Sequence, residues 1–492
     1  MSRARVPATT LAARYVQRHA TDSHGVITLR RWRGDWYRWT SDRGCYVRET
    51  DDQLDGELYR TLSLAKRSEV YDVRHALLAV PGLVIDHCEI GSWLEGECEW
   101  DPRDTAVTAR SLIHLPSREV RPATPRYFAL ASLGAAYVPG ASQPTRWLAF
   151  LSALWPDDPE SISALQEWIG YVLTPDTRHH VILLLIGPTR SGKGTILRAL
   201  SALLGAANVA SPTLSALGTS FGVAPLIGRS VAIIGDARLG GRADTAQIIE
   251  RLLSISGEDI QTVDRKYREP WTGRLSTRFA IASNELPRLP DASDALAHRM
   301  IALRLTRSWL GKEDTSLTAL LLEELPGILA WAIDGWHRLR ARGRFAPPAT
   351  SAEMIADLHD LGSPIAAWVR NHVERDVADD RRWMPCAEAY ALFRTWAEGE
   401  GHRAIATQTL FGRDLRTETG TDRVLVPRDG RRVHVYRGLA LHIEAEARGD
   451  ARGSPRREKH AIEVAWSRPI CGSCRRDITR DHRCDCDREV AP

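Results

Sequence analysis

Lysine is scarce in this sequence, although basic residues are common. Of 66 Lys and Arg residues only five are lysine, which leaves 61 arginines. A compact ammonium and a planar guanidinium are not interchangeable, so a lysine retained against this background indicates a position that needs an ammonium. The five are Lys66, Lys193, Lys266, Lys312 and Lys459. Lys193 lies in a glycine-rich loop, and Lys266 lies in a segment rich in basic and aromatic residues.

Long apolar runs are missing as well. No window of about 18 apolar residues occurs, so we expect no membrane span. The first residues, MSRARVPATTLAARYVQRHA, are basic and lack an apolar signal core, so we do not expect secretion. The net charge is only +4, which excludes a general polycation. A nucleic-acid surface must therefore arise from the local placement of charge.

Cysteine is rare through most of the chain. Four of the eight cysteines are scattered, which suits a reducing cytoplasm. The scattered residues are Cys45, Cys88, Cys98 and Cys386. The other four form a C-terminal cluster of two close pairs, Cys471 with Cys474 and Cys484 with Cys486. Two thiolate pairs on short turns fit a structural Zn²⁺ site, in which His482 could replace one ligand. The alternative is a disordered tail with free thiols.

The chain is long enough for two to four domains. Its composition predicts an N-terminal tail (1–25), a small α+β domain (26–140), a helical collar (141–180), an α/β domain (181–345), a winged-helix-like domain (351–445) and a flexible basic tail (446–492).

Local patterns support these boundaries. Residues 26–50 are rich in Trp, Tyr and β-branched residues with turn signals, which favours a β meander. Residues 145–175 predict two helices separated by PDDPES, with Asp158 or Ser161 as the cap of the second. In the winged-helix-like domain, three predicted helices precede a basic strand–turn–strand segment with a DG turn.

Apolar strand patterns alternate with helical patterns between residues 181 and 305. The expected strands are 181–186, 230–235, 278–283 and 300–305. One helix is expected after the glycine-rich loop and another over 245–257. This alternation predicts an α/β domain with a largely parallel sheet.

The glycine-rich loop has the spacing of a phosphate-binding loop. Its nine residues are Gly187, Pro188, Thr189, Arg190, Ser191, Gly192, Lys193, Gly194 and Thr195. Glycines let the backbone wrap a phosphate, the following helix offers its positive end, and Lys193 would reach the β and γ phosphates of ATP. Gly194 stands where Ser or Thr usually binds Mg²⁺, and Thr195 comes one position late. Whether Thr195 would hold the ion directly or through water stays open.

Two further strands end in polar residues. Asp236 follows the strand 230–235, where an acid that holds Mg²⁺ with Thr195 belongs. Asn284 follows the strand 278–283, and its amide could bind the γ-phosphate or the attacking water. The base that activates this water is unassigned. The candidates are Glu250, Glu258 and Glu285.

The segment 256–279 interleaves basic and aromatic residues. Arg265, Lys266, Tyr267 and Arg268 are central to it, and Trp271, Arg274 and Arg278 follow. Such a mixture suits a loop that grips a nucleic-acid backbone. The alternative is a solvated hairpin. After this segment, Arg299 could stabilise transition-state charge in a neighbouring subunit, and Asp294 could orient the local turn.

In this order the elements resemble the superfamily 3 helicases of the phage and plasmid DNA primase–helicase group. The matching segments are GPTRSGKGT (187–195), VAIIGDAR (231–238), SGEDIQTVDRKY (256–267), IASNELP (281–287) and ALAHR (295–299). The upstream segments RWRGDWYRWTSDRGCYV and WLAFLSALWPDDPESISALQEWIGYVLTP also resemble the pre-helicase region of that group. The likeness runs from about residue 26 to about residue 310, and more loosely through the winged-helix-like domain.

The resemblance implies a P-loop NTPase core of the AAA+ type in a homo-hexameric ring. ATP and Mg²⁺ would bind between subunits, with Lys193, Thr195, Asp236 and Asn284 on one face and Arg299 supplied by the next subunit. Lys266 would lie on a hairpin that enters the central channel and tracks one DNA strand.

The implied function is ATP-dependent unwinding of DNA in phage or plasmid replication, in the cytoplasm of a bacterial host. The motor would translocate on single-stranded DNA and open forked duplex. A separate primase or replication-initiation protein would supply priming, because no cluster of catalytic acids precedes the loop. Two alternatives stay open. One is a nucleotide or small-molecule kinase with a GKGT loop, and the other is an origin-binding scaffold that ATP only assembles.

Overall fold

The structure is a computed structural model. It describes residues 6–64, 66–94, 100–235, 245–286, 293–375, 383–400, 405–428 and 431–441. The chain forms two compact units, Met1–Ala356 and Asp357–Pro492.

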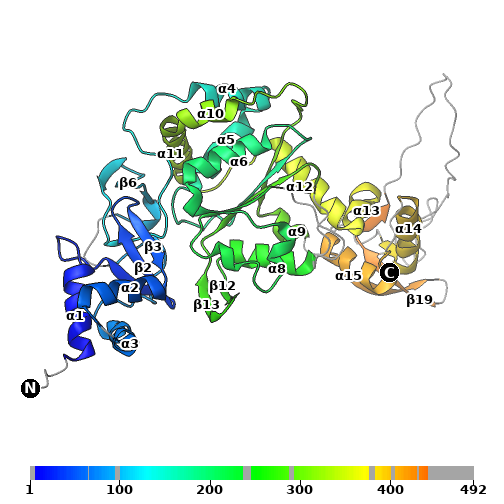
Figure 1. The fold of residues 1–492 in the computed structure, drawn as a ribbon. Coiled ribbons are helices and arrows are strands. Elements are labelled where there is room, and N and C mark those ends of the chain that lie inside the picture. Colours follow the sequence, from blue (N-terminus) through cyan, green and yellow to red (C-terminus); the bar gives the residue numbers. More distant parts are fainter. Residues whose placement is uncertain are drawn as a thin grey trace, which may run out of the picture. The chain divides into compact units, whose positions relative to one another are not determined.

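The first unit begins with a small antiparallel sheet covered by helices (Figure 1). Its strands are β1 (Leu29–Trp32), β2 (Asp35–Thr40) and β3 (Cys45–Glu49), and its helices are α1 (Ala8–His19), α2 (Asp51–Leu62) and α3 (Arg67–Ala76). The β meander predicted over residues 26–50 is therefore confirmed. Arg33 and Gly34 make the tight turn between β1 and β2, both with positive φ (48° and 86°). Apolar side chains of the three helices and of the sheet form a common core.

Short strands connect this sheet to the rest of the unit. They are β4 (Ser92–Trp93), β5 (Thr105–Val107), β6 (Ser111–His114), β7 (Glu119–Pro122) and β8 (Tyr127–Phe128), with the 3-10 turns η1 (Leu77–Ala79) and η2 (Pro102–Asp104). β5, β6 and β7 form an antiparallel sheet, and β4 pairs with β8.

A five-stranded sheet lies at the centre of the first unit. Its order is β10 (Val209–Ala210), β11 (Val231–Ile234), β14 (Arg278–Ser283), β9 (Ile182–Ile186) and β15 (Met300–Arg304). All four neighbouring pairs are parallel. β9 and β14 are buried along their whole length, as expected for inner strands of a parallel sheet covered on both faces. The prediction of an α/β domain with a parallel sheet is confirmed.

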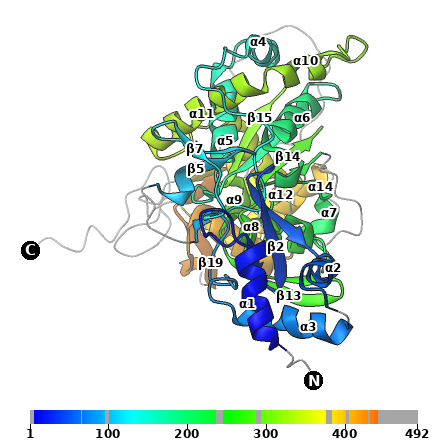
Figure 2. The same ribbon diagram turned by 60° about the vertical axis from the view of Figure 1, so that its left-hand side comes forward.

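Helices and one hairpin join these strands. The helices are α6 (Lys193–Leu204), α7 (Leu214–Leu217), α8 (Thr245–Ser256) and α9 (Ser293–Ala297), with the 3-10 turns η3 (Ala206–Asn208) and η4 (Ala224–Leu226). Between α8 and β14 the chain forms a two-stranded hairpin, β12 (Ile260–Arg265) and β13 (Arg268–Arg274). Figure 2 shows α6 near β14 and β15, and β13 on the side of the N-terminal helices.

Four more helices pack on the central sheet and complete its core. They are α4 (Thr145–Leu154), α5 (Pro159–Tyr171), α10 (Leu317–Glu323) and α11 (Leu325–Arg342). The predicted cap is confirmed, because the Asp158 carboxylate accepts a hydrogen bond from the Ser161 N–H at 2.9 Å. α5 and α11 approach each other closely at Gly170. A Cβ at this position would lie 2.4 Å from the Ala332 carbonyl oxygen, so the glycine permits the approach.

The boundary between the units falls inside α12 (Ala349–Gly362), which begins directly after the two prolines at 347 and 348. Its first turn belongs to the first unit, since the Ala302 N–H of β15 donates to the Ser351 hydroxyl at 2.9 Å.

The second unit contains the predicted three helices followed by a hairpin. The helices are α13 (Pro364–His372), α14 (Cys386–Gly399) and α15 (Gln408–Thr419). The strands are β16 (Val373–Arg375), β17 (Trp383–Pro385), β18 (Arg423–Arg428), β19 (Arg431–Arg437) and β20 (Leu439–Leu441). Trp368, Phe393 and Phe411, one from each helix, pack at the centre of its core.

Candidate functional site

The glycine-rich loop connects β9 to α6, as the sequence predicts. A Cβ on Gly187 would fall 2.3 Å from the Leu305 carbonyl oxygen, so only glycine fits there. Gly192, the residue before α6, has φ +98°, and a Cβ there would also approach Leu154 to 2.9 Å. Arg190 adopts a left-handed conformation, with φ +62°. The loop therefore has a defined shape that depends on its two outer glycines.

Lys193, the first residue of α6, points back into the loop. Its side chain is buried with only 9% of the residue exposed. The ammonium donates to the carbonyl oxygens of Gly187 at 2.6 Å and Pro188 at 2.9 Å, and to the Ser191 hydroxyl at 3.2 Å. It also lies 3.2 Å from the Asn284 amide oxygen. The structure thus brings together two residues that lie 91 positions apart in the sequence and that the motifs singled out.

Thr195 lies in the first turn of α6, beside Gly194. Its hydroxyl accepts a hydrogen bond from Arg198 at 3.1 Å, and the same guanidinium reaches the Thr318 hydroxyl at 3.4 Å. Gly194 and Thr195 both face the same cavity as Lys193. The helix has no acidic residue in its first turn, so its positive end is not neutralised there.

A cavity of about 780 Å³ lies against the loop. One wall is α4, with Arg146 and Phe150, and another is the segment after β15, with Trp309 and Lys312. That segment is fastened to the loop, because Ser308 donates to the Thr189 carbonyl oxygen at 2.8 Å and Trp309 donates to the Arg190 carbonyl oxygen at 2.9 Å.

The cavity is positively charged overall. Its charged lining residues are Arg146, Arg190, Lys193, Arg198, Lys312, Glu313 and Asp314, five cations against two anions. Arg190 pairs with Glu313 at 3.3 Å. The sequence motifs did not identify the cavity-lining residues that α4 and the segment after β15 contribute. Lys312 carried a signal, since it is one of the five lysines.

The carboxyl ends of parallel strands meet at one edge of a sheet. β9 runs into the glycine-rich loop, β14 into Asn284, and β11 into Gly235, so the three ends are neighbours here. Asp236 lies outside the described residues. Glu285 is exposed beside Asn284, Glu250 is exposed on α8, and Glu258 accepts a hydrogen bond from Thr177. None of the three glutamates lines the cavity described here, so the base stays unassigned.

Arg299 lies at the opposite, amino edge of the sheet. Its carbonyl oxygen accepts a hydrogen bond from the Ile182 N–H, at the start of β9, at 2.7 Å. Its guanidinium donates to the Leu253 carbonyl oxygen at 2.5 Å and to the Ser256 hydroxyl at 3.0 Å, both in α8. Within one chain it does not approach Lys193. Its action on a neighbouring subunit stays a prediction, and the side chain of Asp294 lies outside the described residues.

The β12–β13 hairpin also lies at the amino edge, because β14 begins four residues after β13 ends. Arg265 and Arg268 are paired across the hairpin, and Lys266 and Tyr267 form its tip. Both tip residues are exposed, and Tyr267 is completely so (100%) with φ +59°. Arg265 and Arg268 instead form ion pairs with Asp35, at 2.5 and 3.0 Å.

Two residues of the basic segment do not belong to an exposed surface, and that part of the sequence interpretation is wrong. Trp271 is only 2% exposed and packs on Trp32. Arg278, in β14, is buried and donates to the carbonyl oxygens of Val172 and Thr174 at 2.9 and 2.7 Å. Burial lowers the pKa of Arg278 below its usual value. Its place at the start of a buried strand, where backbone carbonyls converge, explains the error.

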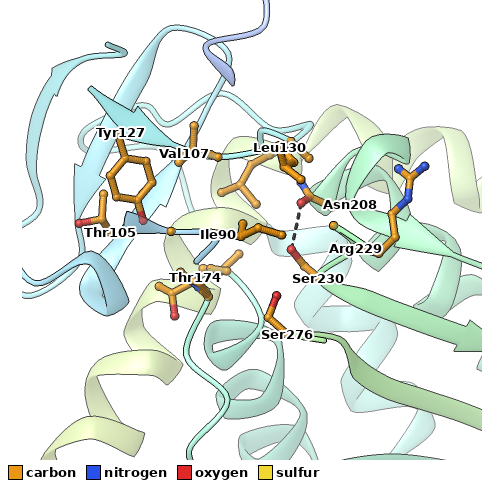
Figure 3. Close-up of a pocket in the computed structure, with 17 residues that line it drawn as sticks. Ile90, Thr105, Val107, Tyr127, Leu130, Thr174, Asn208, Arg229, Ser230 and Ser276 are labelled. Atoms are coloured by element: carbon orange, nitrogen blue, oxygen red, sulfur yellow. Dashed lines mark hydrogen bonds between the residues drawn. The ribbon is translucent and has the colours of Figure 1, made fainter. Parts of the chain in front are cut away.

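A second cavity, of about 50 Å³, lies between β5, β8 and the central sheet (Figure 3). Asn208 and Ser230 lie on one side and are hydrogen-bonded at 2.9 Å, while Tyr127 and Thr105 lie on the other. This space suffices for a few water molecules and not for a nucleotide.

In the part of the chain that the structure describes, no group of three or more His, Cys, Asp or Glu side chains is arranged to hold a metal ion. Cys471, Cys474, Cys484, Cys486 and His482 lie outside the described residues, so the zinc site stays a prediction. Within the described ranges, no helix combines the length and the apolar character that crossing a bilayer requires.

Fold and site together define a mixed α/β protein. A glycine-rich loop, a buried lysine and an asparagine meet at the carboxyl edge of its parallel sheet. Residues 185–299 match the model of a family of unknown function, DUF5906. No curated protein matches.

Solved structures share the fold. One structure of the apo C-terminal region of NrS-1, residues 305–718, has a TM-score of 0.54 at 12% identity, covering 88% of this chain and 100% of that one. Two A-form apo structures of the same region have TM-scores of 0.51, at 13% and 11% identity. They cover 88% and 84% of this chain, and 99% and 97% of their own. At such identities the likeness concerns the fold alone.

Proposed function

We propose that this chain is an ATP-dependent DNA helicase of phage or plasmid replication, a ring-forming motor that translocates on single-stranded DNA. The observation that carries the proposal is the placement of the Lys193 ammonium. It lies inside the glycine-rich loop, 3.2 Å from the Asn284 amide oxygen, at the wall of a cationic cavity of about 780 Å³.

The loop fits a triphosphate. The loop residues Thr189 to Thr195 line the cavity at the amino end of α6, where a helix favours an anion. Lys193 now bonds to carbonyl oxygens, and in the nucleotide complex it would exchange these for phosphate oxygens. Thr195 and Asp236 would hold Mg²⁺, which would neutralise charge on the β and γ phosphates. Asn284, whose amide oxygen lies 3.2 Å from the Lys193 ammonium, would bind the γ-phosphate or the attacking water.

The rest of the cavity fits a nucleoside. Its volume of about 780 Å³ lies within the range of about 300–1,000 Å³ typical of small-molecule sites. Phe150 and Trp309 offer flat apolar surfaces to a base, and Lys312 and Arg146 add positive charge. Arg299 lies at the other edge of the sheet, so a second copy must supply it. A ring of identical subunits, which the resemblance suggests to be a hexamer, would do so.

One observation supports the alternative, an origin-binding scaffold that ATP only assembles. Of the three glutamates considered as the base, none lines the cavity. Strand displacement on forked DNA with ATP and Mg²⁺ decides between motor and scaffold. We expect unwinding by the wild type and none by Lys193→Ala or Arg299→Ala, while Lys66→Ala, a lysine outside the cavity, unwinds normally. Wild-type protein that hydrolyses ATP without displacing any strand would reject the helicase.

A further inference from the structure

Both strands of the β12–β13 hairpin contact the N-terminal sheet. The contact comes from the tight turn between β1 and β2, more than 200 residues earlier in the sequence (the Arg265–Asp35 separation is 230). Two positive φ values in this turn, at Arg33 and Gly34, bring Asp35 and Arg33 to the hairpin. Asp35 contacts the hairpin next to its tip, and Arg33 contacts it further from the tip.

Asp35 holds the two arginines next to the tip. Its Oδ2 lies 2.5 Å from Arg265, and its Oδ1 lies 3.0 Å from Arg268. Arg48 of β3 approaches the same Oδ1 at 3.3 Å. The Asp35 side chain is 14% exposed and that of Arg265 is 11% exposed, so solvent screens this pair little. One carboxylate thus offsets three guanidinium groups, and its removal would leave three like charges facing one another.

Arg33 makes the second contact, further from the tip. Its guanidinium lies between two indole rings, 4.8 Å from the centroid of Trp32 in β1 and 4.8 Å from that of Trp271 in β13. Such cation–π contacts strengthen when they are desolvated. A Cβ on Gly273 would fall 1.4 Å from the Arg33 Nη1 atom, so the glycine leaves the space that this guanidinium fills.

The hairpin needs such support. β12 and β13 form a sheet of only two strands, and an isolated two-stranded hairpin is at best marginally stable in water. Lys266 and Tyr267 at the tip are exposed, and Tyr267 is fully so, in a conformation uncommon for a bulky residue.

We propose that Asp35 is a positioning residue, which holds the hairpin so that Lys266 and Tyr267 are presented to single-stranded nucleic acid. The N-terminal sheet and the hairpin would then move together as one rigid unit. This inference rests on the proposed function, because it assumes that the tip contacts nucleic acid.

Hydrogen–deuterium exchange on the full chain tests the support directly, without DNA or ATP. In Asp35→Ala we expect the amides of residues 260–274 to exchange at least about tenfold faster, since the loss of an ion-pair partner at a low-exposure site opens the element locally. The matched control is Asp51→Ala. Asp51 pairs with Arg74 at 2.9 Å among the N-terminal helices, away from the hairpin. Unchanged exchange in Asp35→Ala would overturn the proposal.

The functional readout is the concentration of single-stranded DNA that half-maximally stimulates ATP hydrolysis. We expect Asp35→Ala to raise it about tenfold while the rate at saturating DNA is kept, and Asp35→Glu to restore most of the loss. If Asp35 acts through the tip, the double variant Asp35→Ala/Lys266→Ala should be no weaker than Lys266→Ala alone. Additive losses would overturn the proposal.

The two failures can be told apart. If DNA does not stimulate the wild type at all, the proposed function fails and the nucleic-acid role of Asp35 fails with it. Exchange at residues 260–274 still shows in that case whether Asp35 supports the hairpin. If the wild type responds to DNA and Asp35→Ala responds equally, only the positioning role is rejected.

Discussion

The two edges of the central sheet differ in how their functional groups are assembled. At the carboxyl edge, nine consecutive residues form the loop around Lys193, and one distant residue, Asn284, joins them. At the amino edge, the hairpin that carries Lys266 is held by Asp35 and Arg33, from a separate sheet far back in the sequence. A contiguous motif shapes the first site, whereas long-range packing shapes the second. Mutations should therefore act locally at the first edge and through other elements at the second.

The largest effect is expected at the carboxyl edge. Lys193→Ala removes the ammonium that would neutralise the β and γ phosphates, and we expect ATP hydrolysis to fall at least about 100-fold. Steady-state phosphate release measures the effect, with Lys66→Ala as the control. Hydrolysis that survives Lys193→Ala would show that the loop is not the nucleotide site.

Buried charge at the amino edge should matter for stability rather than for chemistry. Arg278→Ala leaves the carbonyl oxygens of Val172 and Thr174 without their donor inside the core. Breaking a buried polar contact of this kind costs about 3 kcal/mol or more in the free energy of unfolding. Urea unfolding followed by circular dichroism measures this cost. A change below about 1 kcal/mol would mean that Arg278 is not buried as described.

The exposed tip should give a smaller effect, confined to DNA. For Lys266→Ala we expect the half-maximal concentration of single-stranded DNA to rise about tenfold, because the proposed tip would lose one phosphate contact. Its salt dependence should also become shallower. The control is Arg394→Ala, an exposed arginine of α14 that pairs with Glu398. If Lys266→Ala and the wild type had equal affinity for single-stranded DNA, the hairpin tip would not be part of the DNA interface.

The smallest effect is expected for the rim of the cavity. Arg190 and Glu313 form an ion pair at 3.3 Å, with the Arg190 side chain 62% exposed. Such exposed pairs contribute about 0–1 kcal/mol, so Glu313→Gln should change the unfolding free energy by less than about 1 kcal/mol. If Glu313→Gln instead abolished ATP hydrolysis, as a steady-state assay would show, Glu313 would become the leading candidate for the unassigned base.

The sequence predicts best what depends on neighbouring residues. The loop, the parallel strands and the cap at Asp158 follow from local spacing and periodicity, and the structure has them. The meeting of Lys193 with Asn284 was predictable as well, because parallel strands end at one edge. Mg²⁺ binding by Asp236 stays a prediction, and so does the zinc site of the four C-terminal cysteines, since these residues lie outside the described ranges.

What the sequence could not reveal depends on tertiary packing. The basic residues around Lys266 look alike in the sequence, yet Arg278 is buried, Arg265 is bound by Asp35, and Lys266 is exposed. Burial of an arginine requires converging carbonyl groups that no local pattern shows. Likewise, Trp309 and Lys312 reach the cavity only because the segment after β15 folds back onto the loop.

The central claim is that a nucleotide at one edge of the sheet and nucleic acid at the other are linked in one motor. Titration of single-stranded DNA into the 492-residue chain, with ATP hydrolysis measured at saturating ATP and Mg²⁺, tests this link most directly. We predict a rate that rises several-fold with DNA and reaches a plateau. A rate that stays the same at every DNA concentration would contradict the link.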